Sequence, residues 1–383
     1  MSKEKIWLSS PHMGGTELEY INQAFEANWI APLGPNVTGF EDAIKKYLKN
    51  GTNEPVEVAA LSSGTAALHL ALILLGVKSG DEVLCQSMTF AASANPIKYL
   101  GATPVFIDSE KETFNLCPTE LENAIKDRIA KGNKPKAIIA VHLYGMPYQV
   151  EKINQLSKKY EIPVIEDSAE ALGSTFKGKK CGTFADFSIL SFNGNKIITT
   201  SGGGALVCKG AKNKKEAVFL ATQARDDAPH YQHSKIGYNY RLSNISAGIG
   251  RGQMEVLDDR VEGRRSMFQF YKNLFKNVEG ISLHQEPSQE YFSNRWLSVI
   301  VVDEKVCGFT REDLRKHFEK DNIECRPLWK PMHLQPVFQD YPYYGTGIAK
   351  ELFKNGLCLP SGSNLTNQDK SRIEMSFLDF MKK

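Results

Sequence analysis

The stretch Val164-Ile-Glu-Asp-Ser-Ala-Glu-Ala-Leu-Gly173 closes an apolar run with a carboxylate, Asp167. Further along, Ser191-Phe-Asn-Gly-Asn-Lys-Ile-Ile-Thr-Thr-Ser-Gly-Gly-Gly204 places Lys196 in a small polar loop. Pyridoxal phosphate chemistry needs this pair of residues. A lysine amine condenses with the cofactor aldehyde as a Schiff base, and an aspartate keeps the pyridine nitrogen protonated so that the ring can accept electrons.

Each of these two residues alone has a simpler explanation. A lysine beside glycines is commonly a solvated surface cation, and an Asp after a strand is commonly a helix N-cap, a job that Ser168 can share. Lys196, however, is flanked by the apolar residues 187–192 and 197–198, so we expect it to be half-buried. An unpaired ammonium there would be costly, and this favours the cofactor hypothesis.

Length and composition are those of a globular chain without a nucleic-acid surface. At 383 residues the chain can bury a large core, and we expect a large cofactor-binding domain over 1–255 and a small C-terminal domain over 256–383. The formal net charge is only +3, and the densest basic clusters, 177–180 and 209–215, are typical of exposed loops.

The seven cysteines are scattered, with no C-x-x-C pair and no metal-ligand spacing. We therefore expect reduced thiols in a cytoplasmic protein that holds no metal. The start of the chain, residues 1–7, lacks the apolar segment of a leader peptide, and the apolar runs are too short to span a bilayer. No membrane association is expected.

Short apolar runs alternate with helical patterns from about residue 55 to 210. The expected strands are 56–61, 82–86, 103–108, 137–143, 163–166, 186–192 and 204–208, and the expected helices are 66–75, 93–100, 118–131 and 149–159. This alternation predicts an α/β fold with a mainly parallel sheet covered by helices on both faces. Ligands of such sheets bind beyond the carboxyl ends of the strands, where Asp167, residues 62–65 and the Lys196 loop are expected to lie.

The second half continues this α/β pattern. Residues 247–275 form a long amphipathic helical stretch that is expected to bridge into the second domain. A strand over 296–302, a helix over 311–322 and an αβ cap to residue 383 are expected to follow.

Two further elements fit the cofactor. Residues 61–70 read as a strand, a small-residue turn and a helix, where Gly64 allows close approach and Ser63, Thr65 and the helix N-terminus suit a phosphate. The alternative is an ordinary N-capped helix. Phe90, flanked by small residues after the next strand, can stack on the pyridine ring, although a Phe in such a place is commonly part of the core.

With these residues in place, the chain resembles the DegT/DnrJ/EryC1/StrS family, fold-type I aminotransferases that act on nucleotide-linked keto sugars. The likeness runs almost end to end. The segments that carry it are SSGTAALHLAL (62–72), TFAASANPI (89–97), HLYG (142–145), EDSAEALGS (166–174), GTFADFSILSFNGNKIITTSGGG (182–204) and GYNYRLSNISAGIG (237–250).

The resemblance implies a role for each matching position. Lys196 would carry the cofactor, Asp167 would hold the ring nitrogen, Phe90 would stack on the ring, and Glu170 would lie near the ring hydroxyl. The phosphate would be held by Gly64, Thr65, Ser191 and, from the neighbouring subunit of a homodimer, Asn239. The amino donor would be L-glutamate.

One departure from the family pattern narrows the expected acceptor. Many members carry His-Pro shortly before the lysine, whereas this chain has Asn193-Gly-Asn195. That form resembles the branch that aminates C4 of UDP-linked 4-keto-6-deoxy-N-acetylglucosamine in bacillosamine-type pathways. Residues 11–15, 29–34, 294–298 and 326–333 fit that branch as well. Dehydratase relatives replace the lysine with histidine, so Lys196 argues against a dehydratase.

Two segments of the C-terminal half supply candidate substrate contacts. The cations and donors expected to meet the pyrophosphate and sugar are Arg295, Arg326, Lys330 and His333, with Trp296 and Trp329 as apolar or stacking surface. The alternative for Arg295 and Arg326 is domain packing, with each arginine paired to an acid.

Three other functions remain open at this point. A GDP-4-keto-6-deoxymannose aminotransferase, that is a perosamine synthase, would share the cofactor site. A pyridoxal phosphate lyase or desulfurase is a second alternative, and a desulfurase needs a mobile nucleophilic cysteine, for which Cys325 is the candidate. A non-catalytic regulator on the same scaffold need keep neither Lys196 nor Asp167.

Overall fold

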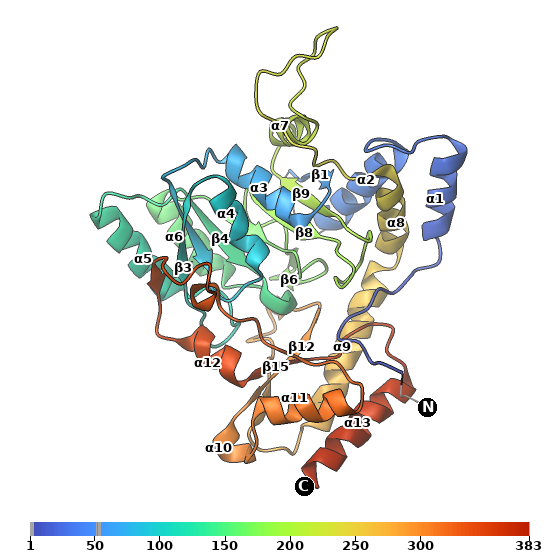
Figure 1. The fold of residues 1–383 in the computed structure, drawn as a ribbon, viewed down its shortest axis with the longest axis vertical. Coiled ribbons are helices and arrows are strands. Elements are labelled where there is room, and N and C mark those ends of the chain that lie inside the picture. Colours follow the sequence, from blue (N-terminus) through green and yellow to red (C-terminus); the bar gives the residue numbers. More distant parts are fainter. Residues whose placement is uncertain (1–3, 51, 53–54, 383) are drawn as a thin grey trace.

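The computed structural model describes residues 4–50, 52 and 55–382. Met1–Lys3 lie outside these residues, and they begin the segment that is expected to lack a leader. Lys383, the last residue of the expected small domain, also lies outside them. The chain forms a large layered part around one broad sheet and a smaller part around a second sheet, and the two are joined by a long helix (Figure 1).

The large sheet has eight strands in the order β1-β9-β8-β5-β4-β2-β3-β14. From β8 to β14 every neighbouring pair is parallel, whereas β9 runs antiparallel to both β1 and β8. The strands are β1 (Glu57–Leu61), β2 (Glu82–Gln86), β3 (Thr103–Ile107), β4 (Ala137–Val141), β5 (Val164–Asp167), β8 (Phe187–Ser191), β9 (Gly204–Cys208) and β14 (Tyr343–Tyr344). The prediction of a mainly parallel α/β sheet is confirmed.

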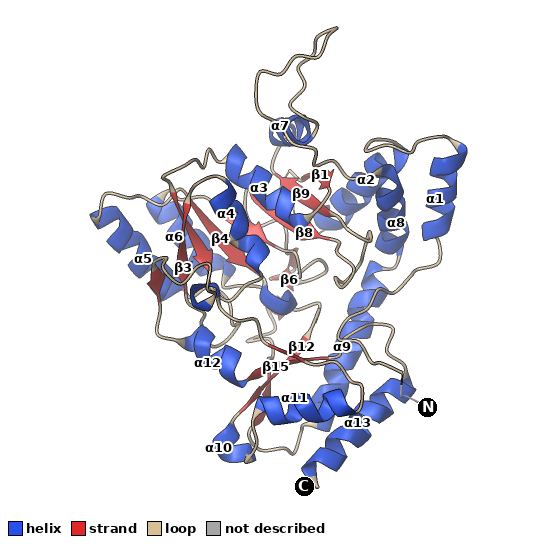
Figure 2. Ribbon diagram, viewed as in Figure 1, coloured by secondary structure: helices blue, strands red, loops and turns tan. Residues whose placement is uncertain are grey.

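Helices cover both faces of this sheet (Figure 2). Alternate strand residues point to opposite faces, so one strand serves two cores. In β1, Ala59 and Leu61 pack with α3 (Gly64–Leu74) and α7 (Ala211–Ala221), while Val58 and Ala60 pack with α2 (Pro35–Lys49). The other covering helices are α4 (Asn95–Tyr99), α5 (Pro118–Ala130) and α6 (Val150–Tyr160), with 3-10 turns at Ala91–Ser93 and Leu143–Gly145.

The predicted elements of this half occur within two residues of the expected bounds, except that the helix expected over 93–100 is split. It consists of the 3-10 turn Ala91–Ser93 followed by α4, because Pro96 has no N–H to donate and is placed in the first turn of a new helix.

A four-stranded antiparallel sheet organises the smaller part. Its order is β10-β12-β15-β13, with β10 (Ile281–Leu283), β12 (Ser298–Val302), β15 (Gly356–Leu359) and β13 (Arg326–Pro327). The helices around it are α9 (Leu257–Leu274), α10 (Glu304–Cys307), α11 (Arg311–Lys320), α12 (Ile348–Asn355) and α13 (Asn367–Met381), with a 3-10 turn at Met332–Leu334.

The helical stretch expected over 247–275 is two helices. α8 (Asn244–Glu255) ends at Val256, where α9 begins. α8 packs on α2 and on α1 (Glu17–Glu26), whereas α9 descends to the small sheet (Figure 1). The proposed domain boundary after residue 255 falls at this break.

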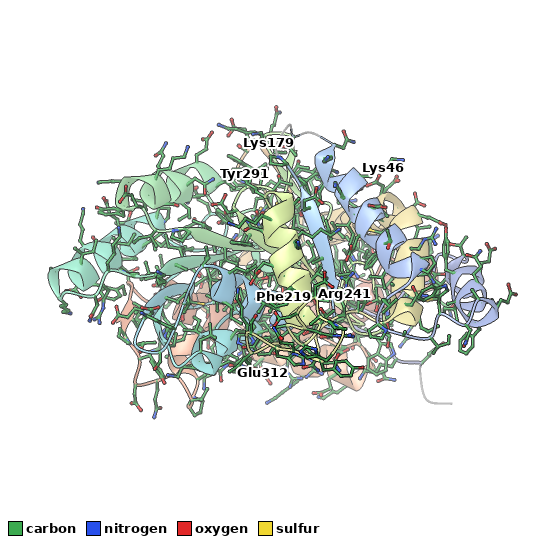
Figure 3. The ribbon with its side chains drawn as sticks, turned by 90° about the horizontal axis from the view of Figure 1, so that it is seen from above. Lys46, Lys179, Phe219, Arg241, Tyr291 and Glu312 are labelled. Atoms are coloured by element: carbon green, nitrogen blue, oxygen red, sulfur yellow. The ribbon has the colours of Figure 1, made fainter. Side chains whose placement is uncertain are left out.

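Segments distant in sequence cross between the two parts. Ile6 forms a bridge with Ile323 and is buried in the small-sheet core, and β14 from the C-terminal half pairs with β3 at the edge of the large sheet. A third, three-stranded sheet consists of β11 (Tyr291–Phe292), β6 (Thr175–Phe176) and β7 (Lys179–Lys180). Viewed from above, the exposed Lys46 and Lys179 lie at the edge of the molecule (Figure 3).

Candidate active site

A cavity of about 530 Å³ lies where β1, β5 and β8 end, and the small part closes its other side. The large-sheet side contributes Gly64 and Thr65 from the start of α3, Asp167 and Glu170 from the end of β5, and Ser191 and Lys196 from the end of β8 and the loop after it. Trp296, Arg326 and Trp329 line the small-domain side. Parallel strands deliver these segments to one edge, which is why residues far apart in sequence converge here.

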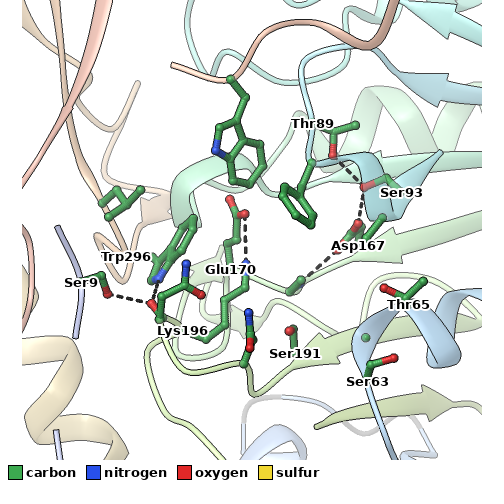
Figure 4. Close-up of a pocket in the computed structure, with 18 of the residues that line it drawn as sticks. Ser9, Ser63, Thr65, Thr89, Ser93, Asp167, Glu170, Ser191, Lys196 and Trp296 are labelled. Carbon is green, nitrogen blue, oxygen red and sulfur yellow. Dashed lines mark hydrogen bonds and ion pairs between the residues drawn. The ribbon is translucent and has the colours of Figure 1, made fainter. Parts of the chain in front are cut away.

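Lys196 points into this cavity with 11% of its side chain exposed (Figure 4). Its Nζ lies 3.3 Å from Glu170 Oε1 and 4.2 Å from the centroid of the Trp296 ring. The carboxylate and the aromatic face both stabilise an ammonium, so they offset the free-energy cost of burying the charged lysine. The expectation of a half-buried lysine in a paired environment agrees with this geometry.

The main chain before Lys196 is held by three other segments. The carbonyl of Asn195 accepts from Ser9 Oγ at 2.7 Å and from Trp296 Nε1 at 2.8 Å (Figure 4). The carbonyl of Lys196 accepts from Arg264 Nη2 at 3.4 Å. These bonds tie the lysine loop to the N-terminal segment and to α9, so its position depends on both parts of the molecule.

Asp167 is buried at the floor of the cavity. Its Oδ2 accepts from Ser93 Oγ at 2.6 Å, and its Oδ1 accepts from the N–H of Ala169 at 3.2 Å. Thr89 Oγ1 lies 2.7 Å from Ser93 Oγ and extends this chain of polar groups (Figure 4). Burial raises the pKa of Asp167, although the two hydrogen bonds and the charge of Lys196 oppose the rise. A cationic partner beside Asp167 would therefore strongly stabilise the ionised carboxylate.

Glu170 occupies the space between the lysine and the cavity wall. Its Oε2 accepts from the N–H of Tyr144 at 2.6 Å, while Oε1 faces Lys196. Burial raises the pKa of Glu170 to about 7, with Lys196 opposing the shift. A carboxyl group with such a pKa can hold or release a proton near neutral pH beside the amine.

The start of α3 forms a cradle for an anion. Ser63 caps the helix by accepting from the N–H of Ala66 at 3.0 Å, and the N–H groups of Gly64 and Thr65 have no acceptor within the helix. A Cβ added to Gly64 would lie 3.2 Å from Ser191 Cβ, and one added to Gly204 would lie 2.3 Å from the nitrogen of Gly64. Only glycines allow β9, β8 and the helix start to approach this closely.

These residues fit pyridoxal phosphate. The amine of Lys196, the buried acid of Asp167 and the helix start at Gly64 offer partners for an aldehyde, a protonated ring nitrogen and a phosphate within one cavity. Phe90 also lines the cavity with 60% of its surface exposed, and its ring centroid lies 5.6 Å from that of Trp329. An exposed ring on the wall is available for stacking, unlike the core Phe of the alternative.

Four predicted residues are not brought to the cavity wall. Arg295 is buried, forms an ion pair with Glu286 and donates to the carbonyl of His284 at 2.5 Å, so the alternative of domain packing describes it. His333 is stacked on Tyr343 with 3.7 Å between ring centroids.

The Nδ1 of His333 lies 2.6 Å from Ser87 Oγ, and Lys330 likewise lies off the wall. Asn239 is exposed and pairs in a bridge with Thr222. Its expected place in the site of a second subunit stays a prediction.

The sequence reasoning missed several residues that shape the site. They are Ser9 and Trp7 from the N-terminal segment, Ser93 beneath Asp167, Tyr144 behind Glu170, and Arg264 on α9. Ser93 lies within the quoted segment 89–97, so a polar residue among alanines was the available signal. Tyr144 lies in the segment 142–145 after β4, which neighbours β5 in the large sheet. Trp7, Ser9 and Arg264 come from segments whose proximity depends on how the two parts pack.

A second buried polar group supports the strands beneath the site. His142 Nδ1 accepts from the N–H of Tyr148 at 3.2 Å, so Nε2 carries the proton and donates to Glu166 Oε1 at 2.7 Å. Glu166 also accepts from Ser188 Oγ at 2.7 Å. Burial raises the pKa of the nearby Cys181 thiol well above its ordinary value. These bonds join β4, β5 and β8. His142, Glu166 and Cys181 are close enough together to hold a metal ion, so the expectation that the protein binds no metal stays a prediction.

Cys325, the candidate nucleophile of a desulfurase, lies in the core of the small part. Burial raises the pKa of its thiol well above the ordinary value. A buried thiol that does not ionise readily does not suit that role.

The fold and the site together define a pyridoxal phosphate-dependent aminotransferase. The profile of the DegT/DnrJ/EryC1/StrS aminotransferase family matches residues 11–377, and the chain belongs to this family. It is 52% identical over 374 residues to EpsN of Bacillus subtilis (strain 168), a protein named for pyridoxal phosphate-dependent aminotransferase activity; the match covers 97% of this chain and 94% of EpsN.

Two other relatives span nearly the whole chain. A GDP-perosamine synthase of Escherichia coli O157:H7 is 38% identical over 370 residues, which cover 97% of each protein. The crystal structure of a DegT DnrJ EryC1 StrS aminotransferase from Brucella abortus superposes with a TM-score of 0.87 at 26% identity and 96% coverage of each chain. The described residues include no helix with the length and apolar character needed to cross a membrane.

Proposed function

We propose that this enzyme transfers the amino group of L-glutamate to C4 of a UDP-linked 4-keto-6-deoxy-N-acetylhexosamine for glycan biosynthesis. The observation that carries the transaminase part is the convergence of Lys196, Asp167 and Glu170 on one cavity, with Nζ of the lysine 3.3 Å from the glutamate. A regulator on the same scaffold would have no use for a buried amine facing two buried acids.

The chain's own groups divide the work. Pyridoxal phosphate, when bound, supplies the aldehyde that carries the amino group and the ring that accepts electrons. Asp167 would stabilise a positive charge at the ring nitrogen, and the helix start at Gly64 would hold the phosphate. Nζ of Lys196 would accept the proton from the α-carbon of glutamate in the first half-reaction and would donate a proton to C4 of the sugar in the second.

The geometry around Lys196 supports its role in proton transfer. Glu170 stands 3.3 Å away with a pKa raised to about 7 by burial, so it can balance the charge of Nζ as the proton arrives and leaves. The ring of Trp296 on the other side limits the positions that the amine can adopt. Trp296, Trp329 and Phe90 give the cavity apolar and aromatic walls beside the lysine.

The acceptor assignment is supported by the loop that carries the lysine. Asn193 and Asn195 line the cavity, and their amides can donate to sugar hydroxyl or acetamido oxygens. A GDP-linked 4-keto-6-deoxymannose is the competing acceptor, because the chain is 38% identical to a GDP-perosamine synthase.

The proposal includes a homodimer. Asn239 would complete the phosphate site of the neighbouring subunit, and its exposed position outside its own cavity is compatible with that arrangement.

Two experiments test the function. Incubation of the purified enzyme with L-glutamate should yield 2-oxoglutarate and change the visible spectrum of the cofactor, and Lys196→Ala should do neither. Borohydride should fix the cofactor on Lys196 in the unaltered enzyme alone. Absence of amino uptake from glutamate contradicts the transaminase assignment.

The sugar is tested separately by kcat/KM on UDP-, GDP- and dTDP-linked 4-keto-6-deoxy sugars. We expect the UDP-linked N-acetylhexosamine to be preferred. A higher kcat/KM for the GDP-linked sugar would reassign the enzyme as a perosamine-type synthase.

A further inference from the structure

The N-terminal segment brings an exposed tryptophan to the cavity. Trp7 lines the same cavity as Lys196, yet 52% of its surface is exposed. The preceding residue, Ile6, is buried in the small-sheet core, so the chain alternates between core and cavity at this point. A large exposed aromatic ring at the wall of a ligand cavity is a candidate contact surface.

The main chain on both sides of Trp7 is held firmly. The N–H of Ile6 donates to the carbonyl of Asn322 at 3.0 Å, and the carbonyl of Ile6 accepts from the N–H of Glu324 at 2.8 Å. The N–H of Leu8 donates to Glu324 Oε2 at 3.1 Å. The ring is therefore presented by a fixed backbone, and a ligand that stacks on it need not order the segment first.

Two cations accompany the ring. Nζ of Lys5 lies 3.9 Å from the centroid of Trp7, and Arg326 lines the cavity with 66% of its side chain exposed. Nε and Nη2 of Arg326 donate to Glu324 Oε1 at 3.0 and 2.7 Å, so the Nη1 side of the guanidinium remains for a ligand. A guanidinium of this kind can bind phosphate oxygens in a bidentate manner.

A second hollow adjoins these residues. A second hollow of about 210 Å³, lined by Lys5, Arg315 and other residues of the small part, shares Glu324 and Arg326 with the first. The first cavity must already contain the cofactor and the keto sugar beside Lys196. The remainder of a nucleotide-linked substrate would then lie against Trp7 and Arg326, which line the same cavity as Lys196.

We propose that Trp7 is the stacking platform for the base of the nucleotide sugar, and that Arg326 and Lys5 face its diphosphate. The inference rests on the proposed function, because it assumes that the acceptor is nucleotide-linked. Base–aromatic stacking contributes roughly 10- to 100-fold in affinity per base and tolerates different bases. The site would thus bind the nucleotide end without itself selecting uracil over guanine.

The test uses the holoenzyme and three probes: UDP, GDP and inorganic pyrophosphate, each titrated by calorimetry. Trp7→Ala should lower the affinity for UDP and for GDP about 10- to 100-fold, because the stacking surface is lost. The affinity for pyrophosphate should stay within about threefold of that of the unaltered enzyme. Trp7→Phe should restore most of the nucleotide affinity. Arg326→Gln should weaken all three probes.

Phe292→Ala is the matched control. Phe292 is also a partly exposed ring with a cation on its face, 4.2 Å from Arg265, but it does not line the cavity. Its removal should leave all three affinities unchanged. Thermal unfolding of each variant shows whether the fold is retained, and the phenylalanine variant keeps the test decisive if the alanine variant is unstable.

The outcomes separate this inference from the proposed function. If the unaltered enzyme transfers nitrogen from glutamate and binds UDP, but Trp7→Ala binds UDP as tightly, the stacking platform is wrong. Equal weakening of UDP and pyrophosphate by Trp7→Ala would also overturn it, because the ring would then act only through the fold. If the unaltered enzyme binds neither nucleotide, the nucleotide-linked acceptor itself is wrong.

Discussion

Replacing Glu170 with glutamine should make the stability of the apoenzyme less dependent on pH. The carboxyl group is buried, and its folded-state pKa is raised from 4.5 to about 7. In the unfolded chain the group loses its proton near pH 4.5, so between these two values the folded state holds more protons. The free energy of unfolding must therefore fall as pH rises through this window.

The size of the effect follows from the same two values. Each unit of pKa difference corresponds to about 1.4 kcal/mol, so the full shift corresponds to about 3 kcal/mol. This penalty is absent below pH 4.5 and complete above pH 7. Glutamine keeps an oxygen for the N–H of Tyr144 but does not ionise, so the variant should not incur the penalty.

Urea unfolding of both apoproteins at pH 5, 6, 7 and 8, at one protein concentration, measures this difference. We expect the free energy of unfolding of Glu170→Gln, measured relative to that of the unaltered protein, to rise by about 1 to 3 kcal/mol as the pH increases from 5 to 8. Glu161→Gln, at a side chain that is 88% exposed, is the control for losing a carboxylate. A stability difference that stays constant over this pH range, or that changes in the opposite direction, would refute the reasoning.

Three further substitutions test the site. Asp167→Asn should slow the single-turnover reaction with glutamate at least about 100-fold, because a neutral amide does not hold the ring nitrogen protonated; an unchanged rate would exclude this role. Gly204→Ala should lower the cofactor affinity measured by equilibrium dialysis and should lower the free energy of unfolding by about 1 to 3 kcal/mol, because the new Cβ would lie 2.3 Å from the nitrogen of Gly64. In the control Gly202→Ala the new Cβ enters open space, so little effect is expected. Arg264→Ala should destabilise the protein by more than about 2 kcal/mol in chemical unfolding, because its guanidinium serves four oxygens including the carbonyl of Lys196, and Arg264→Lys should recover part of the loss.

The meeting of Asp167, Lys196 and Gly64 in one cavity could be predicted because their motifs are local. Asp167 ends a strand, the Lys196 loop follows another, and Gly64 opens a helix, so strand periodicity alone places all three at one edge of a parallel sheet. The antiparallel β9 does not disturb this arrangement, because it lies between β8 and β1 and leaves the edge formed by β5 and β8 intact.

The substrate side could not be predicted in the same way. Arg295, Lys330 and His333 are near lining residues in sequence, but the turns that carry them direct Arg295 towards Glu286 and His333 towards Tyr343. A change of one residue in a loop reverses the direction of a side chain, and composition does not record that direction. Their neighbours Trp296, Arg326 and Trp329 do line the cavity.

The sequence by itself determined the alternation of strands and helices, and with it the meeting of a lysine and an aspartate at the carboxyl edge of the large sheet. Only the tertiary structure decided what surrounds them. Ser9, Trp7 and Arg264 reach the site because the N-terminal segment and α9 contact both the small part and the lysine loop. Local hydrophobic period specifies an element and its buried face, whereas contacts between distant segments depend on the packing of the whole chain.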